Sequence, residues 1–374
     1  MKVIHLILGK ARMNRMNGIN KVVHNLAIHQ SAVDRKAEVW GITSSPEAAV
    51  DPRPYTLRLF RAGGRFRIDS ALKAAIGAEK GNKTIFHLHG GFIPAWAPIG
   101  WTLRQNNIPY VFCPHGAMSP GALKKSGWKK RLYFQLFEKR LLAGASVIQL
   151  LGKNQYEHLE EWVIPQRKVL IPNGQNLSEL AYEILPLTRP DVPIFSFCGR
   201  LDQHYKALDL VIDAMKQYQA AGGRGHLWLI GDGADRQTLE EQATALDLHD
   251  RVSFWGSKFG EEKLNLLGNS DLFIHPSRSE GLPTGVLEAG GLGLPCLLTQ
   301  ATNLGELFAD HQAGWLIDPL SPEAIASSML AAEHAWLEGR SKAMGEAARQ
   351  LILQQFNWAR VAQELVTLYE EIYE

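Results

Sequence analysis

Short apolar segments alternate with longer amphipathic segments along the whole chain, and this alternation is the strongest constraint on the fold. Short apolar runs are typical of buried strands, and apolar residues three and four positions apart are typical of helices. Strands that alternate with helices run parallel, because each helix carries the chain back across the sheet. The predicted strands are 3–8, 37–43, 84–89, 110–115, 147–151 and 169–173 in the first half, and 194–199, 226–231, 251–256, 272–277, 295–300 and 314–318 in the second.

Two sets of about six strands predict two α/β domains, each a doubly wound, Rossmann-like parallel sheet. Residues 185–193 contain three prolines and precede a new strand, so the linker is expected there. The predicted domains are therefore 1–187 and 188–356, and the strongly amphipathic segment 358–373 is predicted to be a final helix. Ligands of such sheets bind at the carboxyl ends of strands, in the loops that lead into helices.

Composition narrows the class of protein further. Of the 374 residues, 45% are hydrophobic, and no apolar run approaches the roughly 20 residues of a membrane span. The first residues resemble a buried strand more than a signal peptide. The three cysteines lie in apolar, strand-like runs without the spacing of metal ligands. We therefore expect a reduced, cytoplasmic protein with no metal site.

Charge is divided unevenly between the two halves. Residues 1–188 carry 26 Lys and Arg against 12 Asp and Glu, whereas residues 189–374 carry 14 against 26. Residues 80–137 contain no acidic residue at all. This asymmetry indicates that the first half meets an anionic partner, either a membrane surface or an anionic ligand. No nucleic-acid-binding motif is present, so nucleic acid is not expected as that partner.

Glu280 and Glu288 lie at a predicted strand-to-helix junction. Residues 272–274 predict a buried strand, 275–283 a loop, and 284 onward a helix. A helix N-terminus offers unpaired N–H groups and a positive dipole end, which suit a phosphate. A carboxylate is a good double acceptor for the vicinal hydroxyls of a ribose or a hexose. The alternative, a solvated loop glutamate and an ordinary helix glutamate, stays open on spacing alone.

A second junction carries cations. Arg200 follows Gly199 after the strand 194–199, and Lys206 is predicted at the start of the next helix. Guanidinium and ammonium groups near one helix end suit a diphosphate, although an unliganded surface pair is the alternative. Gly231 and Gly233 follow the next strand, where glycine permits a tight turn and close approach to a nucleotide. Many such loops are ordinary turns.

Three positions in the first half complete the candidates. Gly18 precedes a predicted helix, 21–29, and its loop can present N–H groups to a phosphate or form an ordinary turn. His115 ends a predicted strand beside Gly116, where it can contact a sugar hydroxyl. His87 and His89 end a neighbouring strand, and lone histidines of this kind are more often structural.

These features together resemble the family 4 retaining glycosyltransferases of the GT-B fold. The pattern Glu280-x7-Glu288 matches the family's E-x7-E, and residues 199–214 match its G-R-L…K-G-x-D-x-L-I-x-A segment. The strand before Gly231, the Pro-His-Gly around His115 and residues 17–23 match further parts in the same order. Ala207 stands where the family usually has Gly, and Leu282-Pro283-Thr284 replaces a commoner Phe-Gly pair, which puts the donor hexose in doubt.

The resemblance implies two domains that face a cleft, with a final helix, 357–374, crossing back to the first domain. It implies retention at the anomeric carbon and a nucleotide-diphospho-sugar donor, with UDP-glucose as first choice and GDP-mannose as second. No other cofactor is expected. The expected catalytic residues are His115, Arg200, Lys206 and Glu280. The expected donor-binding residues are Gly18, Gly199, Gly231, Gly233, Leu282, Pro283, Thr284 and Glu288.

The first domain is expected to bind the acceptor, a saccharide or a lipid-linked saccharide. Residues 124–142 combine basic and aromatic positions in a pattern that predicts an amphipathic helix from 128 to 142. This composition suits an anionic membrane face, so the protein is expected either free in the cytoplasm or bound peripherally to the inner face of the membrane. A solvated basic helix is the alternative. The residues proposed for acceptor or membrane contact are His89, Lys124, Lys125, Trp128, Lys129, Lys130 and Arg131.

Other functions share the predicted fold. A nucleotide-sugar epimerase would release free products without an acceptor, and a sugar phosphorylase would need a lysine that binds pyridoxal phosphate. A non-catalytic module would bind the donor without cleaving it. The joint presence of Glu280, Arg200, Lys206 and His115 favours a transferase, because binding alone does not need all four.

Overall fold

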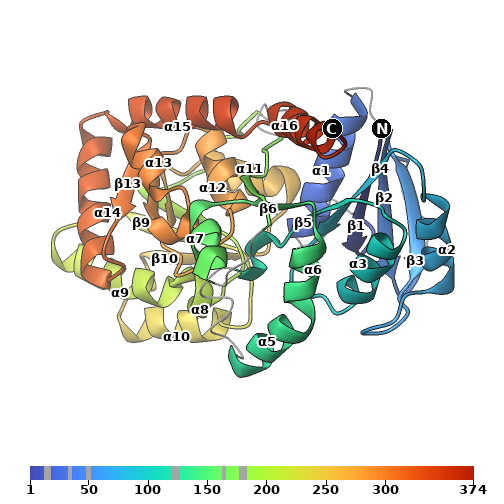
Figure 1. The fold of residues 1–374 in the computed structure, drawn as a ribbon. Helices are drawn as coiled ribbons and strands as arrows, with labels where there is room; N and C mark the ends of the chain where they lie inside the picture. Colours follow the sequence, from blue (N-terminus) through green and yellow to red (C-terminus); the bar gives the residue numbers. More distant parts are fainter. Residues whose placement is uncertain (12–17, 33–35, 48–51, 119–126, 162–165, 177–182) are drawn as a thin grey trace. The chain divides into compact units, whose positions relative to one another are not determined.

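The computed structural model describes residues 1–11, 18–32, 36–47, 52–118, 127–161, 166–176 and 183–374. Contacts divide the chain into two compact units (Figure 1). Unit 1 comprises Met1–Gly174 and Trp358–Glu374, and unit 2 comprises Gln175–Asn357. The domain boundaries predicted from sequence, at 187/188 and 356/357, remain a proposal about where the two domains separate.

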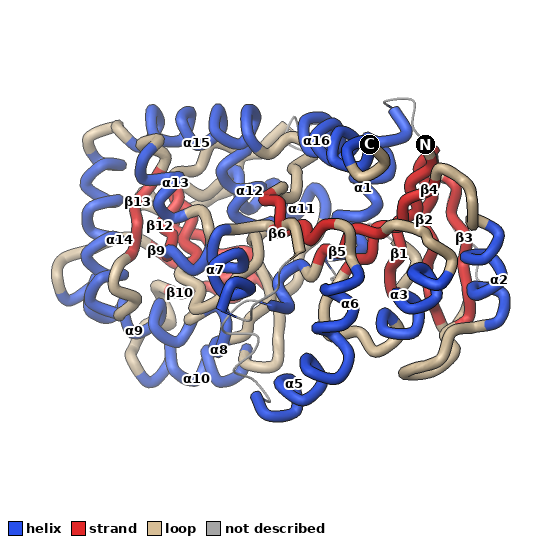
Figure 2. Tube along the Cα trace, in the orientation of Figure 1, coloured by secondary structure: helices blue, strands red, loops and turns tan. Residues whose placement is uncertain are grey.

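Unit 1 contains a parallel sheet in the order β3-β2-β1-β4-β5-β6-β7 (Figure 2). Its strands are β1 Lys2–Leu8, β2 Lys36–Thr43, β3 Thr56–Arg61, β4 Thr84–His89, β5 Tyr110–Cys113, β6 Val147–Leu150 and β7 Lys168–Leu170. Six of these strands were predicted. The seventh, β3, was missed because it is an edge strand whose residues alternate between buried or half-buried and exposed, without a continuous apolar run.

Helices cover both faces of this sheet, as a doubly wound fold requires. They are α1 Gly18–Ala32, α2 Ser70–Ala78, α3 Trp96–Gln105, α5 Gly127–Tyr133, α6 Lys139–Gly144, α7 Lys153–Glu161 and α16 Trp358–Glu371, with a 3₁₀ turn His115–Met118. The final helix α16 packs against α1, and Trp358 and Leu365 share a buried cluster with Val22 and Leu26 of α1. The predicted return of the last helix to the first unit is thereby confirmed.

Residues 127–144 are helical throughout, as predicted for 128–142, but they do not form one regular α-helix. A π-helical segment, Phe134–Glu138, separates α5 from α6. The wider π turn shifts the helical register and turns Glu138 into the interior, where its Oε1 accepts a hydrogen bond of 2.8 Å from the N–H of Phe92. Burial raises the pKa of Glu138 to about 7, and the Phe92 hydrogen bond opposes that rise.

Unit 2 contains a six-stranded parallel sheet in the order β10-β9-β8-β11-β12-β13. Its strands are β8 Ile194–Cys198, β9 His226–Ile230, β10 Val252–Gly256, β11 Leu272–His275, β12 Cys296–Thr299 and β13 Gly314–Ile317. Its helices are α8 Gln203–Lys206, α9 Leu208–Ala220, α10 Arg236–Ala245, α11 Gly260–Gly268, α12 Thr284–Gly291, α13 Gly305–Asp310, α14 Pro322–Leu337 and α15 Ser341–Gln355. All six strands were predicted from their apolar runs, which are almost completely buried in the centre of the sheet.

Each sheet has one point where the strand order reverses direction. That point lies between β1 and β4 in unit 1, and between β8 and β11 in unit 2. Loops leave the sheet in opposite directions there, so the carboxyl ends of these strands leave room for a ligand. The predicted site residues fall largely on these loops. No helix in the described part of the chain is both long and apolar enough to cross a membrane.

Candidate active site

The loops after β8 and β11 bring a cation and a carboxylate together in unit 2. Nζ of Lys206 forms an ion pair with Oε1 of Glu280, and both side chains are only 14% exposed. The two residues are 74 positions apart, so their contact depends on the pairing of β8 with β11. The sequence placed both residues at strand ends but did not predict that they would contact each other.

Three donors converge on Oε1 of Glu280. Besides Lys206, Nε2 of His275 lies at 3.1 Å and Oγ of Ser277 at 3.1 Å. Burial disfavours the charged carboxylate, but the Lys206 ammonium and the His275 hydrogen bond outweigh it and lower the pKa of Glu280 to about 2. Glu280 is therefore an anion at every physiological pH. His275 and Ser277 were not singled out from the sequence, although both lie within five residues of Glu280.

The loop that carries Glu280 is braced from two sides. Arg278 makes a bidentate ion pair with Asp209 of α9, with N–O distances of 2.8 and 2.7 Å. Its backbone N–H also donates to the carbonyl of Tyr205 at 2.8 Å. On the other side, Thr299 donates to the carbonyl of Ser277 at 2.7 Å. Fixed loops hold charges in place without reorganisation, which is what electrostatic catalysis needs.

Arg200 lies beside this pair in sequence but has a different environment. Its side chain is 63% exposed, and its Nε lies 3.8 Å from Oδ2 of Asp202. Lys206 ends α8 and does not begin a helix as predicted, because Ala207 takes a left-handed conformation with φ 54° and separates α8 from α9. This is the position where glycine is usual in the family that the sequence resembles.

The glycines of this region permit close backbone packing. A Cβ on Gly231 would lie 1.8 Å from the carbonyl oxygen of Gly199, and a Cβ on Gly233 would lie 2.2 Å from that of Leu201. The backbone N–H of Gly199 donates to the carbonyl of Ile230, and that of Leu201 donates to the carbonyl of Asp232, each at 3.0 Å. The packing of two neighbouring loops therefore requires both glycines, whatever they do for a nucleotide.

Helix α12 begins at Thr284, as predicted, after Leu282 and Pro283, which are both buried. Glu288 is 4% exposed, and its Oε1 lies 2.7 Å from Nζ of Lys263 on α11. Lys263 is a further candidate that the sequence did not reveal, because it belongs to no recognised motif. Gly285 packs against β8, since a Cβ there would lie 2.7 Å from the carbonyl of Cys198.

In unit 1, Gly18 opens α1 and His115 begins the 3₁₀ turn after β5. A Cβ on Gly18 would meet nothing within 4 Å, so the surface beside it is open. His115 has φ 52°, an unusual value for a residue with a side chain. Its carbonyl accepts a hydrogen bond of 2.6 Å from Nε2 of Gln155, which helps hold this conformation.

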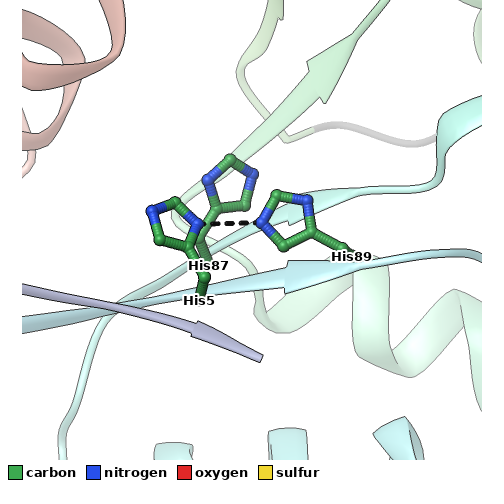
Figure 3. A group of neighbouring side chains, drawn as sticks. All are labelled: His5, His87 and His89. Carbon is green, nitrogen blue, oxygen red and sulfur yellow. Dashed lines mark hydrogen bonds between the residues drawn. The ribbon is translucent and has the colours of Figure 1, made fainter. Parts of the chain in front are cut away.

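His115 belongs to a cluster of buried histidines. Its Nε2 lies 3.1 Å from Nδ1 of His89, whose Nε2 lies 2.9 Å from Nδ1 of His5. Figure 3 shows His5 of β1 beside His87 and His89 of β4. Burial lowers the pKa of His115 to about 4, and it lowers that of His5 to about 4 although the hydrogen bond that His5 donates to Gln30 opposes this change. The pKa values of His87 and His89 are lowered still further by burial and by their histidine neighbours.

The segment proposed for acceptor or membrane contact is partly described. Lys124 and Lys125 lie outside the described residues. Trp128 is 71% exposed, Leu132 53% and Leu136 47%. Lys129 lies with Nζ 5.6 Å from the centre of the Trp128 ring. Lys130 and Arg131 lie on the same helix, α5. Exposed aromatic and aliphatic side chains therefore lie beside basic ones on this segment.

The sequence matches two family profiles. Residues 17–174 match the glycosyl transferase 4-like domain, and residues 186–351 match the glycosyl transferases group 1. The two matches together extend over both units and include the Lys206–Glu280 pair. The chain belongs to the group 1, family 4-like glycosyltransferases, and its fold is GT-B.

Individual relatives agree with this assignment. The putative colanic acid biosynthesis glycosyltransferase WcaL of Salmonella typhimurium is 26% identical over 174 residues. That alignment covers 45% of this chain and 42% of WcaL, so the chain spans less than half of this relative. Among solved structures, sucrose-phosphate synthase from Thermosynechococcus elongatus has a TM-score of 0.79 at 20% identity, covering 100% of this chain and 99% of that one. HepE of Anabaena in complex with UDP-glucose has a TM-score of 0.70 at 16% identity, covering 99% and 100%.

Proposed function

We propose that this protein is a retaining, metal-independent hexosyltransferase that moves a hexose from a nucleotide-diphospho-sugar to a saccharide or lipid-linked saccharide during polysaccharide or glycoconjugate assembly. The observation that carries the proposal is the buried ion pair of Lys206 with Glu280 beyond the carboxyl ends of β8 and β11, with Arg200 exposed on the loop that leads into α8. Charges of both signs are present there for a donor that has an anionic diphosphate and a polyhydroxylated sugar.

The chemistry requires stabilisation of the leaving group. Cleavage of the glycosyl–phosphate bond leaves an oxocarbenium-like sugar and a more negative diphosphate. Arg200 and Lys206 are assigned to the diphosphate, where each preorganised contact contributes about 3 kcal/mol to the transition state. The chain contains no Asp-x-Asp sequence of the kind that holds a divalent metal beside a diphosphate. The fixed cations take the part that a metal plays in other transferases.

Glu280 is assigned to the hydroxyls of the donor sugar and not to nucleophilic attack. A carboxylate whose pKa is held near 2 is a weak base and a poor nucleophile, and three donors already engage Oε1. The acceptor hydroxyl then attacks from the face that the diphosphate leaves, and the leaving phosphate takes the acceptor's proton. Attack by Glu280 through a covalent intermediate is the alternative mechanism.

Glu288 is assigned to the ribose, and Lys263 holds its carboxylate in place. The glycines Gly199, Gly231 and Gly233 keep the surrounding loops close together, and Leu282, Pro283 and Thr284 line the approach to α12. Gly18 is assigned to the phosphates and His115 to the donor sugar. UDP-glucose is the first choice of donor, supported by the fold shared with HepE, and GDP-mannose is the second.

The acceptor is assigned to unit 1. A pocket of about 370 Å³ lies there, lined by Phe66, Ala97, Pro98, Gly100, Trp101, Arg104, Tyr110, Leu136, Phe137, Arg140 and Leu141. Two arginines among apolar side chains suit an amphiphilic, anionic molecule such as a lipid diphosphate. The exposed surface around Trp128 and Leu132 adjoins this region in sequence and suits attachment to an anionic membrane.

Replacement of the two cations tests the assignment of the diphosphate. Arg200→Ala and Lys206→Ala are each expected to lower kcat about 100-fold, the usual effect of losing one preorganised charge contact. Lys216→Ala, which removes an exposed cation from α9, is the matched control and is expected to retain activity. Near-normal turnover in both site variants would remove the assignment. Assays with and without acceptor separate a transferase from an epimerase, whose products form without one.

A further inference from the structure

The histidine cluster of unit 1 is part of a longer buried hydrogen-bond chain. Hydrogen bonds link His87, Tyr369, Gln30, His5, His89 and His115 in that order, and a separate bond joins Gln149, whose side chain interacts with His87, to the carbonyl of Ile171. All of these groups belong to unit 1. Except for His115, each of these side chains is at most 3% exposed, so the hydrogen bonds lie away from bulk solvent.

A carbonyl can only accept, so the direction of the first bond is fixed. Nε2 of Gln149 donates to the Ile171 carbonyl at 2.8 Å, which directs Oε1 of Gln149 away from that carbonyl. The Gln149 side chain interacts with His87 and opposes the lowering of its pKa. Oε1 of Gln149 and Nε2 of His87 are both buried without a hydrogen bond of standard geometry. Because an amide oxygen can only accept, Oε1 of Gln149 can pair with Nε2 of His87 only if that nitrogen carries the proton.

The same logic continues through Tyr369 of α16. With its proton on Nε2, His87 has a bare Nδ1, which must accept from the Tyr369 hydroxyl at 2.7 Å. The Tyr369 oxygen then accepts from Nε2 of Gln30 at 3.5 Å. This bond directs Oε1 of Gln30 to His5, where it accepts from Nε2 of that ring at 2.7 Å.

The remaining bonds set the tautomer of His115. Because His5 has its proton on Nε2, its bare Nδ1 accepts from Nε2 of His89. The bare Nδ1 of His89 in turn accepts from Nε2 of His115. His115 is then left with a bare Nδ1. Since burial keeps the pKa of each of these rings below its ordinary value, all four are neutral at pH 7 and the direction is maintained.

We propose that Tyr369 and Gln30 are positioning residues that fix the tautomer of His115 through His5 and His89, so that Nδ1 of His115 is held as a hydrogen-bond acceptor for a hydroxyl of the donor sugar. The part that concerns the sugar rests on the proposed function. A bare, neutral nitrogen also avoids placing a second positive charge near the oxocarbenium-like centre. The C-terminal helix thereby contributes to catalysis through the hydrogen bond of Tyr369 with His87, two residues that are 282 positions apart in the sequence.

A metal site is the competing use of these rings. His5, His87 and His89 have ring nitrogens within 4.8 Å of one another, as do His89 and His115 with the thiol of Cys113. Zinc would need the lone pairs of Nδ1 of His5 and Nε2 of His89. These two nitrogens already form the 2.9 Å hydrogen bond between the two rings. Every bond in the series can be given the same donor-to-acceptor direction, which favours hydrogen bonding between the rings over metal binding.

The tautomers are measured directly by long-range ¹H–¹⁵N correlation NMR on the free protein with ¹⁵N-labelled histidine. At pH 7 the signals of His5, His87, His89 and His115, assigned from single His→Gln variants, are expected to show a protonated Nε2 and a bare Nδ1. A protonated Nδ1 on His115, or a mixture, would overturn the proposal even if the protein transfers sugar. The expected tautomers in a protein without transferase activity would instead remove the proposed function and leave the chain of hydrogen bonds intact.

Variants test the part played by Tyr369. Tyr369→Phe and Gln30→Met are each expected to give mixed tautomers at His115 and to lower kcat about tenfold, equivalent to about 1.4 kcal/mol of transition-state stabilisation, with little change in KM for the acceptor. Tyr373→Phe is the matched control, because Tyr373 donates to the backbone carbonyl of Thr84 at 2.6 Å, outside the chain. Equal losses in Tyr369→Phe and Tyr373→Phe, or binding of one equivalent of Zn²⁺ that requires His5, would overturn the proposal.

Discussion

Nζ of Lys263 lies 2.7 Å from Oε1 of Glu288, and the two side chains are only 16% and 5% exposed. A buried carboxylate that keeps its charge needs such a partner, because removal of one member of a buried pair leaves an uncompensated charge. The pair joins α11 to α12, the helix that follows the Glu280 loop. It links the stability of unit 2 to the orientation of a residue assigned to the donor.

Lys263→Met is expected to destabilise the protein by about 3 kcal/mol, the usual cost of removing one member of a buried ion pair. Lys258→Met is the matched control, since Lys258 forms a 3.7 Å pair with Glu262, which is 73% exposed, on the surface of the same unit. That variant is expected to change the free energy of unfolding by less than about 1 kcal/mol. Urea unfolding of the two variants decides the matter, and equal effects would show that burial of the Lys263–Glu288 pair is unimportant.

Glu288 and Glu280 are expected to differ in the ligand that each one recognises. Glu288→Ala is expected to weaken binding of UDP itself, because the ribose hydroxyls lose their acceptor. Glu280→Ala is expected to leave UDP binding nearly unchanged and to weaken UDP-glucose about tenfold, the equivalent of one hydrogen bond to a charged group. Calorimetric titration of both variants with both ligands is the measurement. The same pattern of losses in the two variants would contradict the division of roles.

Transfer is expected to be insensitive to removal of divalent metals. The motivation is the absence of an Asp-x-Asp sequence together with the cations Arg200, on the loop after β8, and Lys206, at the end of α8. Initial rates measured after dialysis against EDTA should match those of the untreated protein. Loss of activity that Mg²⁺ or Mn²⁺ restores would show that a metal, and not these side chains, neutralises the leaving diphosphate.

Stability is expected to fall on mild acidification. His5 and His115 have an ordinary pKa of 6.5 when unfolded and a pKa of about 4 when buried. Between these values the unfolded chain binds more protons, so stability is fully present above pH 6.5 and is lost as the pH falls toward 4. Each ring accounts for about 3 kcal/mol over that range. Glu138, whose pKa burial raises to about 7, offsets part of this loss, because the folded state takes up that proton before the unfolded chain does. Glu280, with a pKa of about 2, adds its loss only below pH 4.5.

Urea unfolding between pH 7 and pH 4.5 tests this expectation. His5→Gln should show a shallower dependence on pH than the wild type, whatever its absolute stability. His249→Gln is the control, because His249 is 64% exposed and its removal should leave the slope unchanged. A wild-type stability that stays constant down to pH 5 would mean that the histidines are not buried in neutral form.

Membrane attachment is expected to depend on the basic segment 124–131. Each basic residue near an anionic leaflet contributes about 1 kcal/mol, and this attraction is screened over about 8 Å at physiological salt. Binding to anionic vesicles should weaken as salt rises, and neutral vesicles should bind poorly. Replacement of Lys124, Lys125, Lys129, Lys130 and Arg131 by Ser should abolish sedimentation with vesicles and spare donor binding. Wild-type sedimentation of that variant would make the segment an ordinary solvated surface.

The sequence by itself determined the two doubly wound sheets and the position of most candidate residues. Buried parallel strands need continuous apolar runs, so β8 to β13 could be read directly, and glycine and charge patterns at the ends of β8 and β11 marked the Arg200, Lys206 and Glu280 loops. Features without a periodic signal were lost. The edge strand β3 alternates in burial, and the π segment at 134–138 interrupts a helix whose sequence pattern predicts only a regular α-helix.

Only the tertiary structure decided which of these residues touch. Lys206 meets Glu280 because β8 pairs with β11, and Lys263 meets Glu288 because α11 lies beside α12. His5 meets His89 because β1 pairs with β4, and the final helix then places Tyr369 against His87. Local sequence sets the direction of each strand and helix, whereas strand order and helix packing are collective results of burying the whole core. The contacts that fix the charges and protons of the candidate site depend on strand order and helix packing, so no local sequence pattern predicts them.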